Sequence, residues 1–171
     1  MGYNTDFRGG LSISPEPSQE FTDYINEFSD IRHMAIDVDK MVEMFPESKK
    51  LGRFFTDDFG TEGEFVVLDL DNTGYVLRAA LDNKETPVID HNEPPKGVPG
   101  LWCQWVIEDG ELVWDGAEKF YNYIEWLEYM IVNFFKPAGY TLNGVIEWRG
   151  EDWDDTGKIT VTDNKIEVEY V

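Results

Sequence analysis

The stretch Asp152–Asp163, which reads DWDDTGKITVTD, places oxygen-bearing side chains at the spacing of a calcium-binding loop. Asp152, Asp154, Thr156 and Asp163 occupy ligand positions of such a loop, with a glycine at its sharp turn. Two features count against it: the flanking residues are β-branched and strand-like, and the last position holds Asp instead of a bidentate Glu. The sequence leaves two interpretations, a calcium site or a pair of acidic β-turns, and favours the turns.

A second acidic motif, VVLDLDNTG over residues 66–74, consists of an apolar run followed by D-x-D-x-T. It resembles the first motif of haloacid-dehalogenase-like phosphatases. The resemblance implies that Asp69 is a nucleophile and Asp71 a general acid–base beside Mg²⁺, which would offset the repulsion between carboxylate and phosphate. That family needs a parallel sheet of strand–helix units, which the rest of this chain does not predict. The favoured interpretation is a tight turn between two antiparallel strands, Glu64–Leu70 and Tyr75–Leu81.

Aromatic residues are more numerous in the second half of the chain than a core of this size requires. On the face of a sheet they could stack on a flat ligand such as a nucleotide, whose phosphate would need Arg8, Arg149 or Lys158 nearby. The alternative, which we favour, is a packed core with one hydrophobic interface.

The connection over residues 83–100 contains four prolines and two glycines, too many for regular structure. Loops of this length in compact domains are often functional. Cys103 follows soon after, but a thiol between tryptophans in a strand is expected to be buried and inert. The candidate binding residues belong to this loop, to the strand after it and to the region beyond the long helix: Asp90, His91, Asn92, Trp102, Gln104, Trp148 and Trp153.

The longest helical pattern covers residues 115–136, where apolar residues recur at steps of three and four. Asp115 can cap its first turn, and Pro137 and Gly139 end it. Shorter helices are predicted at residues 17–29 and 39–45, the latter supplying methionines to a core.

Strands are predicted at residues 5–14, 101–107, 111–114, 141–149, 158–162 and 165–170. In the last two, which turn at Asp163 and Asn164, alternation directs Ile166, Val168 and Tyr170 toward the core and Glu167 and Glu169 toward water. The sequence therefore predicts an α+β fold in one domain over residues 1–171. A single antiparallel sheet of about five or six strands carries two or three helices, and a ferredoxin-like split arrangement is the predicted topology.

The chain of 171 residues carries a net charge of −21. Such acidity argues against nucleic acid and anionic membranes as ligands, because both attract clustered Lys and Arg. It favours a partner protein with a basic surface, although solubility alone also explains an acidic surface. A single cysteine and the lack of an apolar run after Met1 predict a cytoplasmic protein. The sequence does not fix an oligomeric state.

The segments MGYNTDF, PPKGVPGLWCQW, WDGAEKFYNYIEWLEYMI and KPAGYTLNGVIEWRGEDWDDTGKITVTDN cover both ends and the second half of the chain. They resemble a family of small acidic proteins encoded by bacteria and by viruses, for which no activity is established. The resemblance implies a phage or viral accessory role, for example in countering host defence. We therefore expect a non-enzymatic acidic protein that binds a partner protein, with a nucleotide-binding protein and a metal-dependent phosphatase as alternatives.

Overall fold

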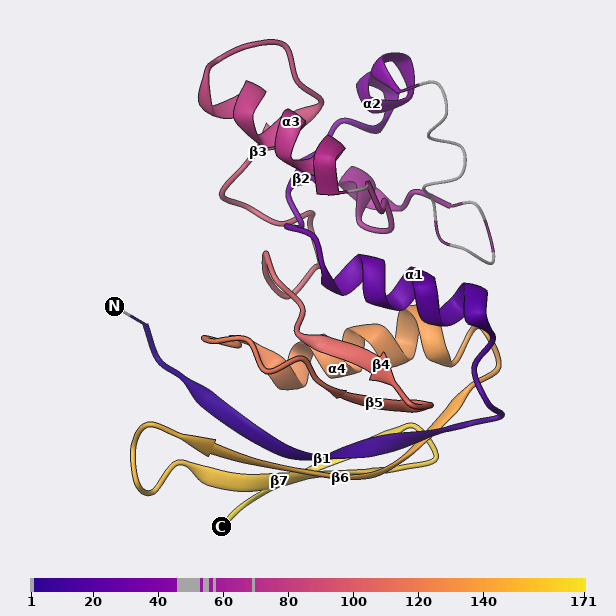
Figure 1. The fold of residues 1–171 in the computed structure, drawn as a ribbon, viewed down its shortest axis with the longest axis vertical. Helices are drawn as coiled ribbons and strands as arrows, with labels where there is room; N and C mark the ends of the chain where they lie inside the picture. The colour runs from indigo at the N-terminus through magenta and orange to yellow at the C-terminus, as the bar shows by residue number, and fades with distance from the viewer. Residues whose placement is uncertain (1, 46–52, 54–55, 57, 69) are drawn as a thin grey trace. The chain divides into compact units, whose positions relative to one another are not determined.

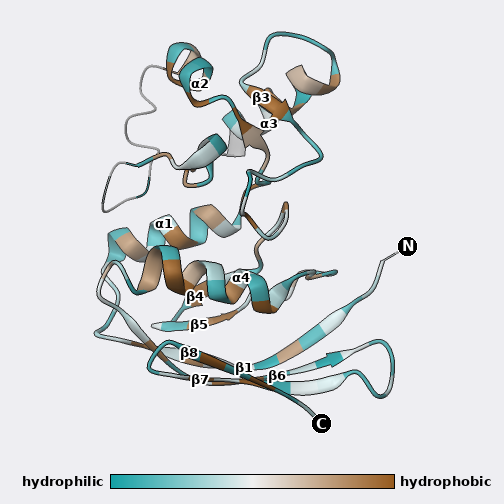
Figure 2. Ribbon diagram, turned by 180° about the vertical axis from the view of Figure 1, so that it is seen from behind, coloured by the Kyte–Doolittle hydropathy of each residue, from teal (hydrophilic) through white to brown (hydrophobic). Residues whose placement is uncertain are grey.

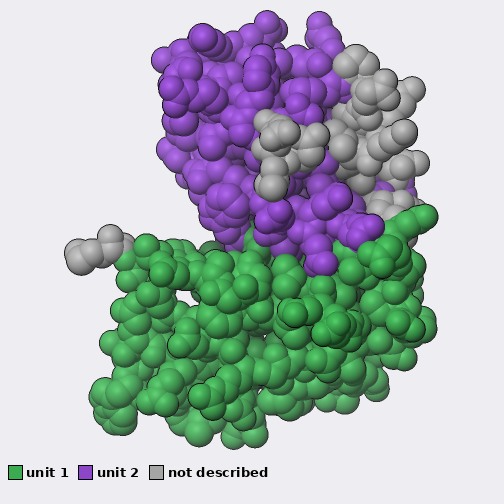
Figure 3. Space-filling model, viewed as in Figure 1, with its two compact units in different colours: residues 1–22, 103–171 green, residues 23–102 purple. Residues whose placement is uncertain are grey.

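The computed structural model describes residues 2–45, 53, 56, 58–68 and 70–171. The chain forms two compact units (Figure 3): unit 1 comprises Met1–Thr22 and Cys103–Val171, and unit 2 comprises Asp23–Trp102. The prediction of a single domain stays a prediction. None of the helices in the described part of the chain has the length and hydrophobicity that crossing a bilayer requires.

Unit 1 is built on a six-stranded sheet in which every pair of neighbours is antiparallel. The strand order is β4-β5-β1-β6-β7-β8. The strands are β1 (Thr5–Ser14), β4 (Trp105–Glu108), β5 (Glu111–Trp114), β6 (Thr141–Gly150), β7 (Thr156–Thr162) and β8 (Lys165–Tyr170) (Figure 1).

The first four of these strands in the chain follow the ferredoxin-like βαββαβ order. Helix α1 (Gln19–Ser29) lies between β1 and β4, and helix α4 (Tyr123–Met130) lies between β5 and β6. Strand β5 separates β1 from β4, and β6 pairs with the other side of β1, which is the split βαβ arrangement. The predicted α+β class is thus confirmed, and the order of these four strands is that of the predicted arrangement. Unit 2 begins within α1, at Asp23, and ends before β4, and β7 and β8 extend the sheet beyond β6.

Helix α4 lies over one face of this sheet (Figure 2). Leu11, Ile146 and Ile159 on the strands, and Trp126 and Leu127 on the helix, are fully buried. The helix is shorter at its start than the predicted 115–136. Gly116, Lys119 and Asn122 all adopt positive φ angles, which a helix cannot include. After Met130 the helix continues as a π-helical turn over Ile131–Phe135.

Unit 2 contains β2 (Ala35–Ile36), α2 (Val38–Met44), a 3₁₀ turn (Thr61–Gly63), α3 (Leu70–Leu81) and β3 (Val88–Asp90). Its core includes Met34 and Met41, as the sequence predicts. The Asp37 side chain caps α2 by accepting a hydrogen bond from the Lys40 amide at 3.2 Å.

The predicted hairpin at residues 64–81 is wrong, because Leu70–Leu81 is a helix. Thr73 and Val76 are buried, and Leu77 and Ala80 are half-buried. Their spacing of three and four residues is that of a helix. The apolar run Tyr75–Leu81 is short, and the hydrophobic pattern of so short a run does not distinguish a strand from a helix. Helix α3 packs Val76 into the unit 2 core.

Candidate protein-binding groove

The residues predicted to bind calcium do not come together. Asp152 and Asp154 are exposed in the turn between β6 and β7, whereas Asp163 lies in the turn at the other end of β7. A seven-residue strand separates the two turns by about 20 Å. The Thr156 hydroxyl donates to the Val171 carbonyl at 2.7 Å. Across the described residues, no group of three or more His, Cys, Asp or Glu side chains is arranged to hold a metal ion.

The turn that contains Asp152 is fixed by its own hydrogen bonds. The Tyr3 hydroxyl donates to Asp155 Oδ2 at 2.7 Å and accepts from the Asp152 amide at 3.1 Å. Trp148 Nε1 donates to Asp155 Oδ1 at 3.0 Å. One carboxylate of this acidic turn is therefore a structural acceptor, which agrees with the β-turn interpretation.

The phosphatase-like motif would require Asp69 and Asp71 at the end of a strand in a parallel sheet. Asp69 lies outside the described residues, and Asp71 belongs to helix α3. The strands of the described segments pair only in antiparallel fashion, whereas the motif requires a parallel sheet.

The predicted loop residues of unit 2 form a local turn. The Asp90 carboxylate accepts from the Asn92 amide at 2.9 Å, and Arg32 donates to the His91 carbonyl at 3.0 Å and to Asn92 Oδ1 at 3.3 Å. Trp102, at the end of unit 2, has 48% of its surface exposed. The hydrogen bonds of this turn all form within unit 2, from the loop itself and from Arg32.

Of the predicted binding residues in unit 1, only Trp153 is on the surface, with 85% of its area exposed. Gln104 is buried; its Nε2 donates to the Glu118 carbonyl at 2.8 Å and its Oε1 accepts from Trp114 Nε1 at 3.0 Å. Trp148 is buried as well. These three residues therefore do not make one binding surface.

Most aromatic side chains of unit 1 pack against one another in the core. Phe7 makes edge contacts with Trp105, Trp114, Phe120 and Tyr123 at ring-centroid distances of 4.9 to 5.8 Å. Burial raises the pKa of the Tyr123 hydroxyl to about 12. The aromatic surplus is thus largely core, as the favoured interpretation predicts.

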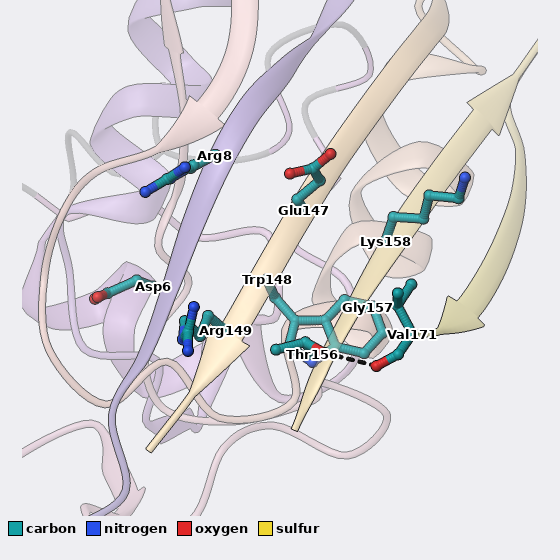
Figure 4. A pocket seen from close by; sticks show the side chains of 9 residues that line it. All are labelled: Asp6, Arg8, Glu147, Trp148, Arg149, Thr156, Gly157, Lys158 and Val171. Carbon is teal, nitrogen blue, oxygen red and sulfur yellow. Dashed lines mark hydrogen bonds between the residues drawn. The ribbon is translucent and has the colours of Figure 1, made fainter. Parts of the chain in front are cut away.

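The open face of the sheet has a hollow of about 330 Å³ that does bring Arg8, Arg149 and Lys158 together (Figure 4). Each cation is paired with a carboxylate on a neighbouring strand. Glu147 on β6 is opposite Arg8 on β1 and Lys158 on β7, and Arg149 on β6 is opposite Asp6 on β1. Lys158 Nζ also lies 3.4 Å from Glu169. Opposite charges on neighbouring strands stabilise the sheet, and they leave no surplus of positive charge for a phosphate.

A more distinctive feature is an apolar groove of about 350 Å³ between α4 and the edge strand β8. Ile124, Ile131 and Val132 line it from the helical side, and Ile166 and Val168 line it from β8. Its polar lining residues are Glu128 on α4 and Asn164 in the turn before β8. Val132 is 57% exposed and Val168 37%. Ile166, Val168 and Tyr170 lie on the same face as the buried Ile159 and Val161, as predicted, but Ile166 is only half-buried and Val168 and Tyr170 are exposed.

The other edge of the sheet differs. On β4 the side chains that point to the covered face, Trp105 and Ile107, are buried. The groove beside β8 is therefore a local property of that edge. It was not found by sequence reasoning, because the alternation in β8 indicates which side chains face inward but not whether anything lies over them.

The rim of the groove is acidic on its helical side. Glu128 lines it, and Glu125 is exposed one turn earlier on α4, whereas Glu167 and Glu169 lie on the opposite, open face of β8. The groove thus combines an apolar floor with carboxylates on its α4 side.

In comparisons with known proteins, no protein-family model, curated protein or solved structure matches the chain.

Proposed function

We propose that this chain is an acidic, non-enzymatic binding protein of the cytoplasm. It engages a partner protein with a basic surface, and the groove between α4 and β8 is the docking site. The observation that carries the proposal is an uncovered apolar floor beneath an acidic rim.

The two parts of the groove would contribute differently to binding. Covering exposed apolar side chains such as Val132 and Val168 supplies affinity, at roughly 25 cal/mol for each Å² removed from water. The carboxylates of the rim, within a chain of net charge −21, attract and orient a basic partner and speed its association.

The alternatives have less support from the described residues. A nucleotide-binding surface would need exposed aromatic side chains beside the cations of the open face, and Trp148 beneath them is buried. A viral accessory role, in which the partner is a host defence protein, is compatible with the proposal and rests on the resemblance alone.

The test is capture of partner proteins from a host lysate by three proteins: the wild type, Val132→Asp and Leu81→Asp. Both substitutions place a carboxylate at an exposed apolar position, since Leu81 is 52% exposed on α3 of unit 2. We expect Val132→Asp to lose partners that the wild type and Leu81→Asp both retain. We also expect capture to weaken as salt rises from about 0.05 to about 0.5 M, because salt screens exposed charges. Capture that is identical for Val132→Asp and the wild type would refute the groove as the docking site.

A further inference from the structure

We infer that the groove binds an extended segment of the partner, which adds to the free edge of β8 as a further strand. The segment carries apolar side chains on one face and Lys or Arg on the other. This inference rests on the proposed function and specifies the form of the ligand.

The backbone of β8 supplies hydrogen-bonding groups for such a strand. The Val171 amide donates to the Thr156 carbonyl of β7 at 2.9 Å. Because main-chain groups alternate in direction along a strand, those of Glu169 and Glu167 also face β7. The amides and carbonyls of Ile166, Val168 and Tyr170 therefore point away from the sheet, and within the described residues nothing pairs with them.

This edge lacks two features that commonly prevent pairing, a bulge and a proline. The register with β7 runs without interruption from Gly157 and Tyr170 to Thr162 and Lys165, so no bulge twists the edge away. The strand contains no proline, and its charged side chains lie on the open face of the sheet. Edges of this kind readily accept another strand.

The side chains of β8 then define the sequence pattern of the segment. Residues paired opposite Ile166 and Val168 would point into the apolar groove, and a residue opposite Tyr170 would lie on the same face of the sheet. Residues paired opposite Glu167 and Glu169 would lie on the open face, where carboxylates favour a cation across the strand. An alternating apolar and basic segment satisfies both faces at once.

A second copy of the chain fits this edge less well. Antiparallel self-pairing centred on Glu167 would match Lys165 with Glu169 but would set two Glu167 carboxylates opposite each other. Each copy also carries a net charge of −21, and the two would repel. A basic segment has neither disadvantage.

The test uses labelled synthetic peptides of about ten residues, which is long enough to cover β8. One alternates Val and Lys, and a second has the same composition with all Val residues before all Lys residues. A third is the alternating peptide with N-methyl groups on the amides that would donate to β8. Binding to the full-length chain is measured by fluorescence anisotropy. We expect the alternating peptide to bind at least about tenfold more tightly than either control, because the controls lose the pattern or the hydrogen bonds.

The matching protein variants are Val168→Pro and Val168→Thr. Proline removes only an amide that points away from β7, so the internal ladder stays intact, whereas threonine keeps both the amide and the β-branched shape. We expect Val168→Pro to reduce binding of the alternating peptide at least about tenfold, and Val168→Thr to retain it. The N-methylated peptide tests the same main-chain hydrogen bonds on the wild-type protein, so the test does not depend on correct folding of the proline variant.

Absence of binding by the alternating peptide, or equal binding of the three peptides, would overturn strand addition. So would a wild-type dimer in sedimentation that Val168→Pro dissociates, because the edge would then belong to a second copy. Partner capture lost in Val132→Asp but retained in Val168→Pro would leave the proposed function standing while strand addition fails. Capture unaffected by Val132→Asp would remove both.

Discussion

Burial of His33 makes unit 2 sensitive to acid. The imidazole is buried, its Nε2 lies 2.7 Å from the Phe28 carbonyl and its ring lies 4.1 Å from the Phe28 ring. Loss of hydration lowers the pKa of His33 from 6.5 to about 4, and the hydrogen bond to Phe28 only partly opposes this effect. The neutral form is therefore the one that unit 2 accommodates.

The sign of the effect follows from which state binds the proton. Between the two pKa values the unfolded chain is protonated at His33 and the folded chain is not, so acid favours unfolding. The full contribution of neutral His33 is present above about pH 6.5 and is lost as the pH falls toward about 4. From about pH 8 to about pH 5 the loss is roughly 2 kcal/mol, because a tenfold change in a protonation equilibrium corresponds to about 1.4 kcal/mol.

The assay compares the wild type with His33→Gln, which keeps a side-chain donor but cannot titrate. Urea unfolding at both pH values gives four free energies of unfolding. The advantage of the wild type over the variant should shrink by roughly 2 kcal/mol at the lower pH. The carboxylates are the same in both proteins, so their contribution to the pH dependence of the free energy of unfolding cancels in the difference. An advantage that stays constant with pH would show that His33 does not contribute in this way.

Three further results are expected. Gly157→Ala should lower the free energy of unfolding by about 1 to 3 kcal/mol, because its new methyl group would meet the buried Trp148 ring and lie 2.6 Å from the Glu169 carbonyl; an unchanged thermal midpoint would contradict this. Gly74→Ala, in helix α3 with nothing within 4 Å, should raise stability by about 1 kcal/mol, and a loss of stability would show that α3 is not a helix there. Cys103 is buried with its sulfur 3.4 Å from Met130 Sδ, so a thiol reagent should label it roughly a thousandfold more slowly in native protein than in urea; rapid labelling of the native chain would place Cys103 on the surface.

The sequence by itself determines much of unit 1. Alternation in residues 165–170, and on either side of the glycine pair in residues 5–14, specifies strands whose apolar side chains share one face, because a strand has a period of two. Asp163 and Asn164 both adopt positive φ, as the predicted two-residue turn requires. These local signals, joined by two helical patterns, were enough to predict the ferredoxin-like order of strands.

Only the tertiary structure decides the rest. The apolar run at residues 75–81 suits a strand or a helix, and packing of Val76 into the unit 2 core fits the helix. Whether an apolar side chain is covered depends on elements distant in the chain: Ile107 and Val168 both face the covered side of the sheet, but only Ile107 is buried. The groove beside β8 exists because the sheet extends one strand beyond the cover that α4 provides, and no local pattern in the sequence records that.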